Sequence, residues 1–261
     1  MIPKIIHFCW LSNEEYPKTI KKCISSWKNK LPDYEFILWD TKKFDINSTL
    51  WTNQAYEAKK YAFVADYIRF YAVYKYGGIY LDMDVEVLKK FDALLNLPYF
   101  IGSQFDNLIE AAIFGAEKKT DWVLDCLKYY EDRSFIKEDG HLDLLVLPVI
   151  MQLQIKQARK IILLKPNDIN NISELIVNRN LFFLFSSEYF SPKNHQTGKV
   201  LVSRKTYTIH HYNNSWLPFI SKIRLKLVKF IGVNNTEKII NSLSLRKVTT
   251  KLKRKTTLKK T

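Results

Sequence analysis

The residues best suited to chemistry lie in one short stretch, YGGIYLDMDVE, at positions 76–86. Three carboxylates, Asp82, Asp84 and Glu86, occupy alternate positions behind a double glycine. If 79–88 forms one extended strand, all three acids share one face and the other face is apolar. Asp is a poor strand former, and like charges about 6.5–7 Å apart repel one another unless a cation lies between them. The pattern indicates either a solvated strand face or a site for Mg²⁺ or Mn²⁺, which prefer oxygen ligands.

The elements that would hold this stretch alternate between strand and helix. Apolar, β-rich runs predict strands at 4–11 and 34–40, and apolar residues three and four apart predict a helix over 16–30 between them. A second helix is expected over about 54–75, ending at the double glycine, because glycine adopts the left-handed conformation that closes a helix. This alternation predicts an α/β fold with a parallel or mixed sheet, and ligands bind such sheets at the carboxyl ends of the strands. Further strands are expected at 98–105, 111–116, 160–164, 181–185, 199–203 and 207–212, and a helix at about 121–131.

Positive charge is concentrated at the end of the chain. The 261 residues carry a formal net charge of +15, and 217–261 contain 13 Lys and Arg against one acid. The remainder, 1–216, has 28 basic and 25 acidic residues and is nearly neutral. We therefore expect a domain over 1–216 and a tail over 217–261, with a basic amphipathic helix at 219–232 and a disordered Lys/Arg-rich end. That helix either binds an anionic membrane surface or packs on the domain with a solvated basic face.

Composition and cysteine usage predict a globular, cytoplasmic protein. With 47% hydrophobic residues the chain can bury a large core, but no apolar run approaches the roughly 18 residues of a membrane span, and the first residues do not resemble a signal peptide. The three cysteines, Cys9, Cys23 and Cys126, form no CxxC pair, which argues against a disulfide framework or a zinc ribbon. We expect them to be buried as apolar residues; the alternative is that Cys9, near His7, is a nucleophile.

A long segment, YAFVADYIRFYAVYKYGGIYLDMDVE at 61–86, resembles the DXD sugar segment of glycosyltransferase family 32. Two further pieces are similar to the opening and closing motifs of that family: IPKIIHFCWL at 2–11 and TIHHYNNSW at 208–216. The resemblance implies a GT-A fold, in which a single mixed, mostly parallel sheet is flanked by helices. It also implies retaining transfer of a sugar from a UDP- or GDP-sugar to a growing surface polysaccharide, as in capsule and lipopolysaccharide synthesis, or to a lipid-linked oligosaccharide.

The same resemblance implies a metal site. Asp82 would contact the ribose and the water shell of a Mn²⁺ or Mg²⁺ ion, and Asp84 would bind that ion directly. A late histidine would complete the ligand set, since imidazole is compatible with Mn²⁺. His210 and His211 point to opposite faces of a strand, so only one of them can reach the metal, and His210 is favoured.

A second set of residues would bind the donor. Asp66 would accept hydrogen bonds from sugar hydroxyls, and Arg69 would pair with an acid of the DXD motif or with a sugar hydroxyl. Without the resemblance these two residues, three apart on one helix face, would be interpreted as a surface ion pair. Trp10 would stack on the nucleotide base; the alternative is ordinary core packing. Ser215 and Trp216 would donate hydrogen bonds to the diphosphate from a loop that closes over it.

The resulting prediction is a metal-dependent hexosyltransferase that uses a nucleotide-sugar donor and a glycan or lipid-linked glycan acceptor. Its basic tail would bind anionic lipid, so that the protein lies peripherally on the inner face of the plasma membrane. Glu110 lies in a segment that corresponds to the acceptor side of the family and is a further candidate for the site. Two alternatives stay open: a metal-dependent phosphodiesterase, and a nucleic-acid-binding protein that acts through its basic tail. The nearly neutral body argues against a nucleic-acid partner.

Overall fold

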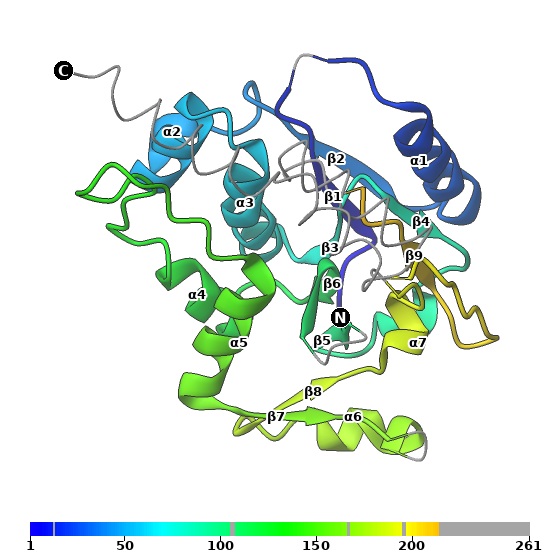
Figure 1. Cartoon of the computed structure of the whole chain (residues 1–261). Helices are drawn as coiled ribbons and strands as arrows, with labels where there is room; N and C mark the ends of the chain where they lie inside the picture. Colours follow the sequence, from blue (N-terminus) through cyan, green and yellow to red (C-terminus); the bar gives the residue numbers. More distant parts are fainter. Residues whose placement is uncertain (13, 105–107, 166–167, 195–196, 214–261) are drawn as a thin grey trace, which may run out of the picture. The chain divides into compact units, whose positions relative to one another are not determined.

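The computed structural model describes residues 1–12, 14–104, 108–165, 168–194 and 197–213, and the elements below belong to the unit formed by Met1–Lys193 and Val200–Trp216 (Figure 1). The helices of this part are α1 (Lys18–Lys30), α2 (Leu50–Glu57), α3 (Tyr61–Tyr76), α4 (Asp121–Lys128), α5 (Leu147–Ala158), α6 (Ile172–Leu175) and α7 (Ser187–Phe190), with short 3₁₀ turns at Ile46–Ser48, Asp92–Leu94 and Asp168–Asn171. Its strands are β1 (Ile5–Cys9), β2 (Glu35–Trp39), β3 (Gly78–Leu81), β4 (Val85–Val87), β5 (Tyr99–Ser103), β6 (Ile109–Ala116), β7 (Lys160–Leu163), β8 (Leu181–Leu184) and β9 (Thr208–His210).

The central sheet has the strand order β2-β1-β3-β6-β5. β1 runs parallel to both β2 and β3, and β6 runs antiparallel to both β3 and β5, so β6 alone is reversed within this sheet. Helix α3 packs against β1 and β3, α5 packs against β6, and α7 packs against β5. This single mixed sheet, mostly parallel and flanked by helices, confirms the α/β fold that was expected. Because β2, β1 and β3 are parallel, their carboxyl ends meet at one edge of the sheet.

Three of the predicted elements were wrong in their extent. The strand expected over 79–88 is two strands in different sheets: the chain leaves the central sheet after Leu81, turns through Asp82 to Asp84, and pairs with β9 from Val85 onward. The amide of Val85 donates to the carbonyl of Asp82 at 3.0 Å, which closes this turn. The helix expected over 54–75 is two helices, α2 and α3, which Lys59 separates with a φ of 56°. The segment 199–203 forms no strand and makes a single bridge through Val200.

The connection from α3 to β3 is fixed by two glycines and a histidine. Gly77 and Gly78 have φ values of 69° and 106°, where a side chain is strained, and a Cβ added at Gly78 would lie 2.8 Å from the carbonyl oxygen of Ile5. The Nε2 of His7 lies 2.8 Å from the carbonyl oxygen of Gly77, and the indole N–H of Trp39 donates to His7 Nδ1 at 3.1 Å. His7 therefore orders the start of β3 from the neighbouring strand.

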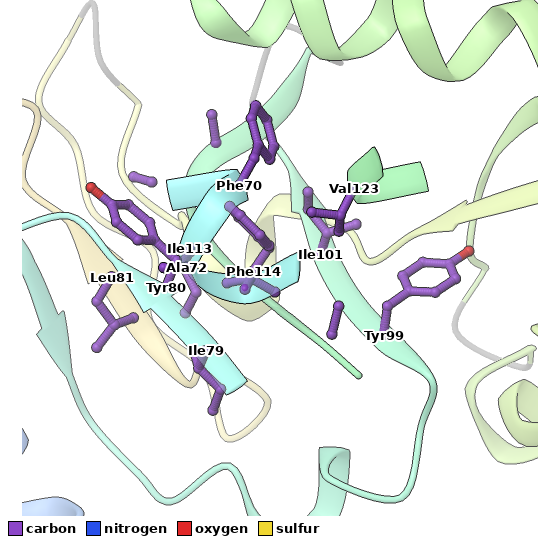
Figure 2. Close-up of a cluster of buried hydrophobic side chains, with 14 of the residues drawn as sticks. Phe70, Ala72, Ile79, Tyr80, Leu81, Tyr99, Ile101, Ile113, Phe114 and Val123 are labelled. Carbon is purple, nitrogen blue, oxygen red and sulfur yellow. The ribbon is translucent and has the colours of Figure 1, made fainter. Parts of the chain in front are cut away.

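The core lies where the central sheet meets the helices. Helix α3 is apolar around most of its circumference, as its FVA and FYAV runs require, and it is buried accordingly. Figure 2 shows part of this core, in which aromatic and aliphatic side chains from α3, α4, β3, β5 and β6 pack together: Phe70, Ala72, Ile79, Tyr80, Leu81, Tyr99, Ile101, Ile113, Phe114 and Val123. This packing fixes β3, so that the acidic turn after it has a rigid base.

The structure also bears on the predictions about membrane spans, the cysteines and the basic tail. In the part of the chain that the structure describes, no helix combines the length and the apolar character that crossing a lipid bilayer requires. The three cysteines are free and buried, as expected. Burial raises the pKa of the Cys9 thiol to about 12, which argues against a nucleophilic role. The basic tail at 217–261 lies outside the described residues, and so do Ser215 and Trp216.

Candidate active site

Asp82, Asp84 and His210 form a cluster at the carboxyl edge of the sheet. The two aspartates lie in the turn after β3, and β9 brings His210 beside them because Val85 and His210 are paired in the antiparallel β4–β9 ladder. One ligand atom from each of the three side chains lies within 4.8 Å of the other two. Two carboxylates and one imidazole fit a divalent cation such as Mn²⁺. The structure therefore brings the expected ligand set together, although a turn, not a strand, aligns the two aspartates.

Asp84 is held as a carboxylate. Its Oδ1 lies 3.5 Å from His210 Nε2, and its Oδ2 accepts a 2.7 Å hydrogen bond from the amide of Asn213. Burial opposes ionisation of Asp84, but the charge of His210 and these hydrogen bonds outweigh it and lower the pKa to about 2. Tyr212, with a φ of 53°, turns the chain after β9 so that Asn213 can reach this carboxylate. A permanently ionised Asp84 suits a metal ligand.

His210 lies between two carboxylates. Its Nε2 faces Asp84, and its Nδ1 is 3.2 Å from Oε1 of Glu110, a side chain with no exposed surface. Glu110 also accepts hydrogen bonds from the amide of Ala112 at 2.9 Å and from the hydroxyl of Tyr212 at 3.2 Å. Burial disfavours the imidazolium, but Glu110 and Asp84 together raise the pKa of His210 well above its usual value. For Glu110, burial is outweighed by His210 and by hydrogen bonds, so its pKa is lowered.

The neighbouring residues Glu86 and His211 lie apart from this cluster. The Nε2 of His211 pairs with Oε2 of Glu86 at 2.9 Å, and Nζ of Lys22 lies 3.5 Å from the other oxygen of that carboxylate. The expectation that Glu86 shares a face with Asp82 and Asp84 was therefore wrong, because the turn breaks the alternation of side chains. His210 and His211 do have different partners, as their adjacent positions in a strand require.

Arg69 joins the helix to the acidic turn. Its Nη2 lies 2.9 Å from Oδ1 of Asp66 and 3.3 Å from Oδ1 of Asp82, and its Nη1 donates to the carbonyl of Ala111 at 2.7 Å. The side chains of Arg69 and Asp66 are 6% and 12% exposed, so the interpretation as a surface ion pair was wrong. Burial raises the pKa of Asp66 to about 7, against the opposing effect of Arg69. The guanidinium also lies 4.6 Å from the ring centre of Tyr80.

Trp10 follows β1 directly and lies at the same edge of the sheet as the acidic turn. Its indole N–H donates to the carbonyl of Glu14 at 3.0 Å, and its ring meets Tyr16 edge to face with centroids 5.0 Å apart. The side chain is half-buried. These contacts fix the ring at the surface of the domain, and stacking on a base stays a prediction.

Sequence reasoning missed two residues of the site. Tyr80 donates a hydrogen bond from its hydroxyl to Oδ1 of Asp82 at 2.9 Å, and Tyr212 contacts Glu110 and forms a 2.7 Å hydrogen bond with the hydroxyl of Ser191. The position of Tyr80, two residues before an aspartate in a strand, was an available signal. No local signal indicates Tyr212, since its partner is more than a hundred residues away.

A mixed α/β sheet with carboxylates and a histidine at its carboxyl edge defines the class of the protein: an α/β fold with a candidate divalent-metal site. Residues 17–101 match a family described as "Glycosyltransferase sugar-binding region containing DXD motif". The match, with Asp82 and Asp84 as the two acids of the motif, confirms over this segment the resemblance seen in the sequence.

Curated relatives carry the names of mannosyltransferases. Over 134 residues the chain is 34% identical to "Inositol phosphoceramide mannosyltransferase 3" of Schizosaccharomyces pombe. This alignment covers 49% of this chain and 36% of that protein. The chain is also 30% identical over 146 residues to "Mannosyl phosphorylinositol ceramide synthase CSH1" of Saccharomyces cerevisiae. This second alignment covers 52% of this chain and 38% of that protein. The chain thus matches little more than a third of the length of these relatives.

Solved glycosyltransferase structures resemble the fold at low sequence identity. "PaToxG Glycosyltransferase" aligns with a TM-score of 0.46 and 18% identity, over 68% of this chain and 72% of that one. The galactosyltransferase LgtC, solved with donor and acceptor sugar analogs, aligns with a TM-score of 0.37 and 13% identity, over 68% of this chain and 84% of that one.

Proposed function

We propose that this protein is a metal-dependent glycosyltransferase that moves a hexosyl group from a nucleotide-sugar to an acceptor carried by a lipid. The observation that carries the proposal is the convergence of Asp82, Asp84 and His210 inside a chain whose residues 17–101 match a DXD sugar-binding region. In the reaction the bond between the anomeric carbon and the diphosphate breaks, and a bond to an acceptor hydroxyl forms. The hydroxyl loses its proton, and the nucleoside diphosphate leaves with the negative charge.

Asp84 and His210 are the direct ligands that we assign to the metal, with Asp82 beside them. A bound divalent cation would neutralise the diphosphate and so stabilise the charge that develops on the leaving group. Glu110 accepts from Nδ1 of His210, which leaves Nε2 directed at Asp84 and available for a ligand bond. Glu110 is therefore a positioning residue in this proposal, and not the acceptor-side residue suggested by the sequence.

Asp66 and Arg69 are assigned to the donor sugar. Arg69 is already engaged by Asp66, Asp82 and a main-chain carbonyl, so its role is to hold both carboxylates in place. The carboxylate of Asp66 is the acceptor that we assign to the sugar hydroxyls. On the basis of the resemblance, we still assign Trp10 to stacking on the nucleotide base. Ser215 and Trp216 are likewise assigned to hydrogen bonds with the diphosphate.

The names of the relatives support a lipid-borne acceptor. Both named enzymes act, by their names, on a phosphoinositol ceramide and transfer mannose. We therefore place mannose first among donor sugars and a phosphoinositol lipid first among acceptors, ahead of the capsule and lipopolysaccharide glycans considered from the sequence. A cytoplasmic location on the inner face of a membrane is proposed with this acceptor.

A donor panel tests this function. The protein is incubated with UDP- and GDP-linked mannose, galactose and glucose, with Mn²⁺ or Mg²⁺ and inositol phosphoceramide, and release of nucleoside diphosphate and formation of glycolipid are measured. We expect one donor to react, and Asp84→Asn to lower the rate by about 100-fold or more, because a ligand to the leaving-group metal is lost. The matched control, Asp139→Asn, changes a carboxylate that is 66% exposed and should stay within about twofold.

Two results would contradict the proposal. One is that no donor reacts although the protein binds Mn²⁺. The other is hydrolysis of nucleotide esters that carry no sugar, at a rate that the acceptor does not change, which would favour the phosphodiesterase alternative.

A further inference from the structure

Three consecutive aliphatic side chains face solvent just before the strand that carries His210. Val200, Leu201 and Val202 are 40%, 53% and 55% exposed. Single exposed aliphatic residues are ordinary on a protein surface, but a contiguous run is a feature of surfaces that bind something. We call Val200–Lys205 the 200–205 segment.

The backbone of the 200–205 segment is held in place. The amide of Leu201 donates to the carbonyl of Pro192 at 3.1 Å, and the amide of Ser203 donates to the hydroxyl of Thr206 at 3.0 Å. A further bond, from the Ser203 hydroxyl to Glu188 at 2.6 Å, ties the segment to α7. A folded frame therefore presents the aliphatic side chains to solvent, which lowers the entropic cost of burying them in a partner.

Cations border the aliphatic run. Arg204 and Lys205 follow it and are exposed, and Nζ of Lys89 donates to the carbonyl of Arg204 at 2.9 Å, so a third cation lies alongside. The carboxylate of Glu188 lies 3.6 Å from Lys205 and offsets one of these charges. Aliphatic side chains with a cationic border match the two layers of an anionic membrane surface, apolar chains beneath phosphate headgroups.

We propose that the 200–205 segment docks on an anionic lipid surface, with Leu201 and Val202 entering the interface and Arg204 and Lys205 contacting the headgroups. His210 comes eight positions after Val202 in the chain, so docking would hold the candidate metal site within at most about 29 Å of the membrane. Docking through this segment requires neither sugar transfer nor the basic tail.

A local probe tests the proposal in the full chain. The native cysteines are buried, so Leu201→Cys provides an exposed thiol for an environment-sensitive fluorophore. Val177→Cys, at a side chain that is 70% exposed, is the matched control position. With phosphatidylcholine vesicles that contain phosphatidylserine, we expect a blue shift and a several-fold rise in fluorescence at position 201 and no change at 177. Vesicles of phosphatidylcholine alone should give a much smaller response at 201.

Paired substitutions measure how much the segment contributes. Leu201→Ser with Val202→Ser should weaken binding to the anionic vesicles by about tenfold, whereas Leu153→Ser with Val177→Ser, at exposed sites elsewhere, should stay within about twofold. The proposal is overturned if the protein does not bind these vesicles, or if it binds them with no change at position 201. A blue shift before vesicles are added would also overturn it, since another part of the chain would then cover the segment. Nucleotide release measured without vesicles reports separately on the proposed sugar transfer.

Discussion

His7 is fully buried and the side chain of His210 is only 12% exposed, yet the neighbours of these two histidines favour opposite charges. The contacts of His7 are neutral, a main-chain carbonyl and an indole N–H, and burial lowers its pKa to about 4. His210 lies between Asp84 and Glu110, which overcome burial and raise its pKa. An uncharged imidazole such as that of His7 can act as a permanent structural group. A protonated imidazole between two carboxylates, such as that of His210, can lose its proton and bind a metal ion in its place.

The same contrast separates two regions of the molecule. The framework region, His7 with Trp39, Gly77 and Gly78, is held by neutral hydrogen bonds and backbone fit. The charged region contains the buried and partly buried groups around the acidic turn: Asp66, Arg69, Asp82, Asp84, Glu110 and His210. Stability in the framework should therefore depend on packing and protonation of one histidine, whereas in the charged region it should depend on keeping cations and carboxylates together.

Removal of Arg69 should have the largest effect. Arg69→Ala leaves the buried Asp66 and the partly buried Asp82 without their permanent cation, so the free energy of unfolding should fall by about 3–5 kcal/mol. Urea denaturation without added metal measures it. Arg179→Ala is the matched control, because its side chain and that of its partner Asp121 are 90% and 66% exposed, and it should cost less than about 1 kcal/mol. Equal losses in the two variants would show that the charged region is not organised around Arg69.

The Asp66–Arg69 pair was predictable because it is local. Residues three apart on a helix are neighbours whatever the rest of the fold does, and the double glycine marks the end of that helix in the same local way. The strand boundary after Leu81 was not predictable, because it depends on a partner outside the segment: the amide of Asp82 donates to the carbonyl of Ala112 in β6. The alternation of apolar and acidic residues predicted one strand over 79–88, but β3 ends at Leu81.

Acid should destabilise the protein through His7. The pKa of His7 is lower in the folded protein than in the unfolded chain, so the unfolded state binds a proton first as the pH falls. Its contribution to stability is complete above about pH 6.5 and is lost progressively toward pH 4, up to about 3 kcal/mol. Stability measured by denaturation across this range should fall more steeply in the wild type than in His7→Gln.

A matched histidine separates this effect from general acid denaturation. His141→Gln removes a side chain that is 82% exposed, and its pH profile should follow the wild type. If His7→Gln also follows the wild type, the framework region does not depend on a neutral His7.

Long-range contacts explain what sequence reasoning could not supply about the charged region. Glu110 and His210 are 100 residues apart, and they meet because β6 belongs to the central sheet while β9 pairs with β4. Both residues were candidates from the sequence, but Glu110 was assigned to the acceptor side. No feature of the sequence near Glu110 indicates that its carboxylate contacts His210.

The smallest expected effect tests that contact. Glu110→Ala should weaken Mn²⁺ binding by about 10–100-fold, because the imidazole of His210 loses the acceptor that orients it. Glu110→Gln keeps an oxygen acceptor without the charge, so it should restore part of the affinity. Calorimetric titration with Mn²⁺ at pH 8 measures both variants, and Glu117→Gln, at a carboxylate that is 41% exposed, is the control that should bind as the wild type does. Wild-type affinity in Glu110→Ala would mean that His210 is oriented by Asp84 alone, and the charged region would then end at the acidic turn.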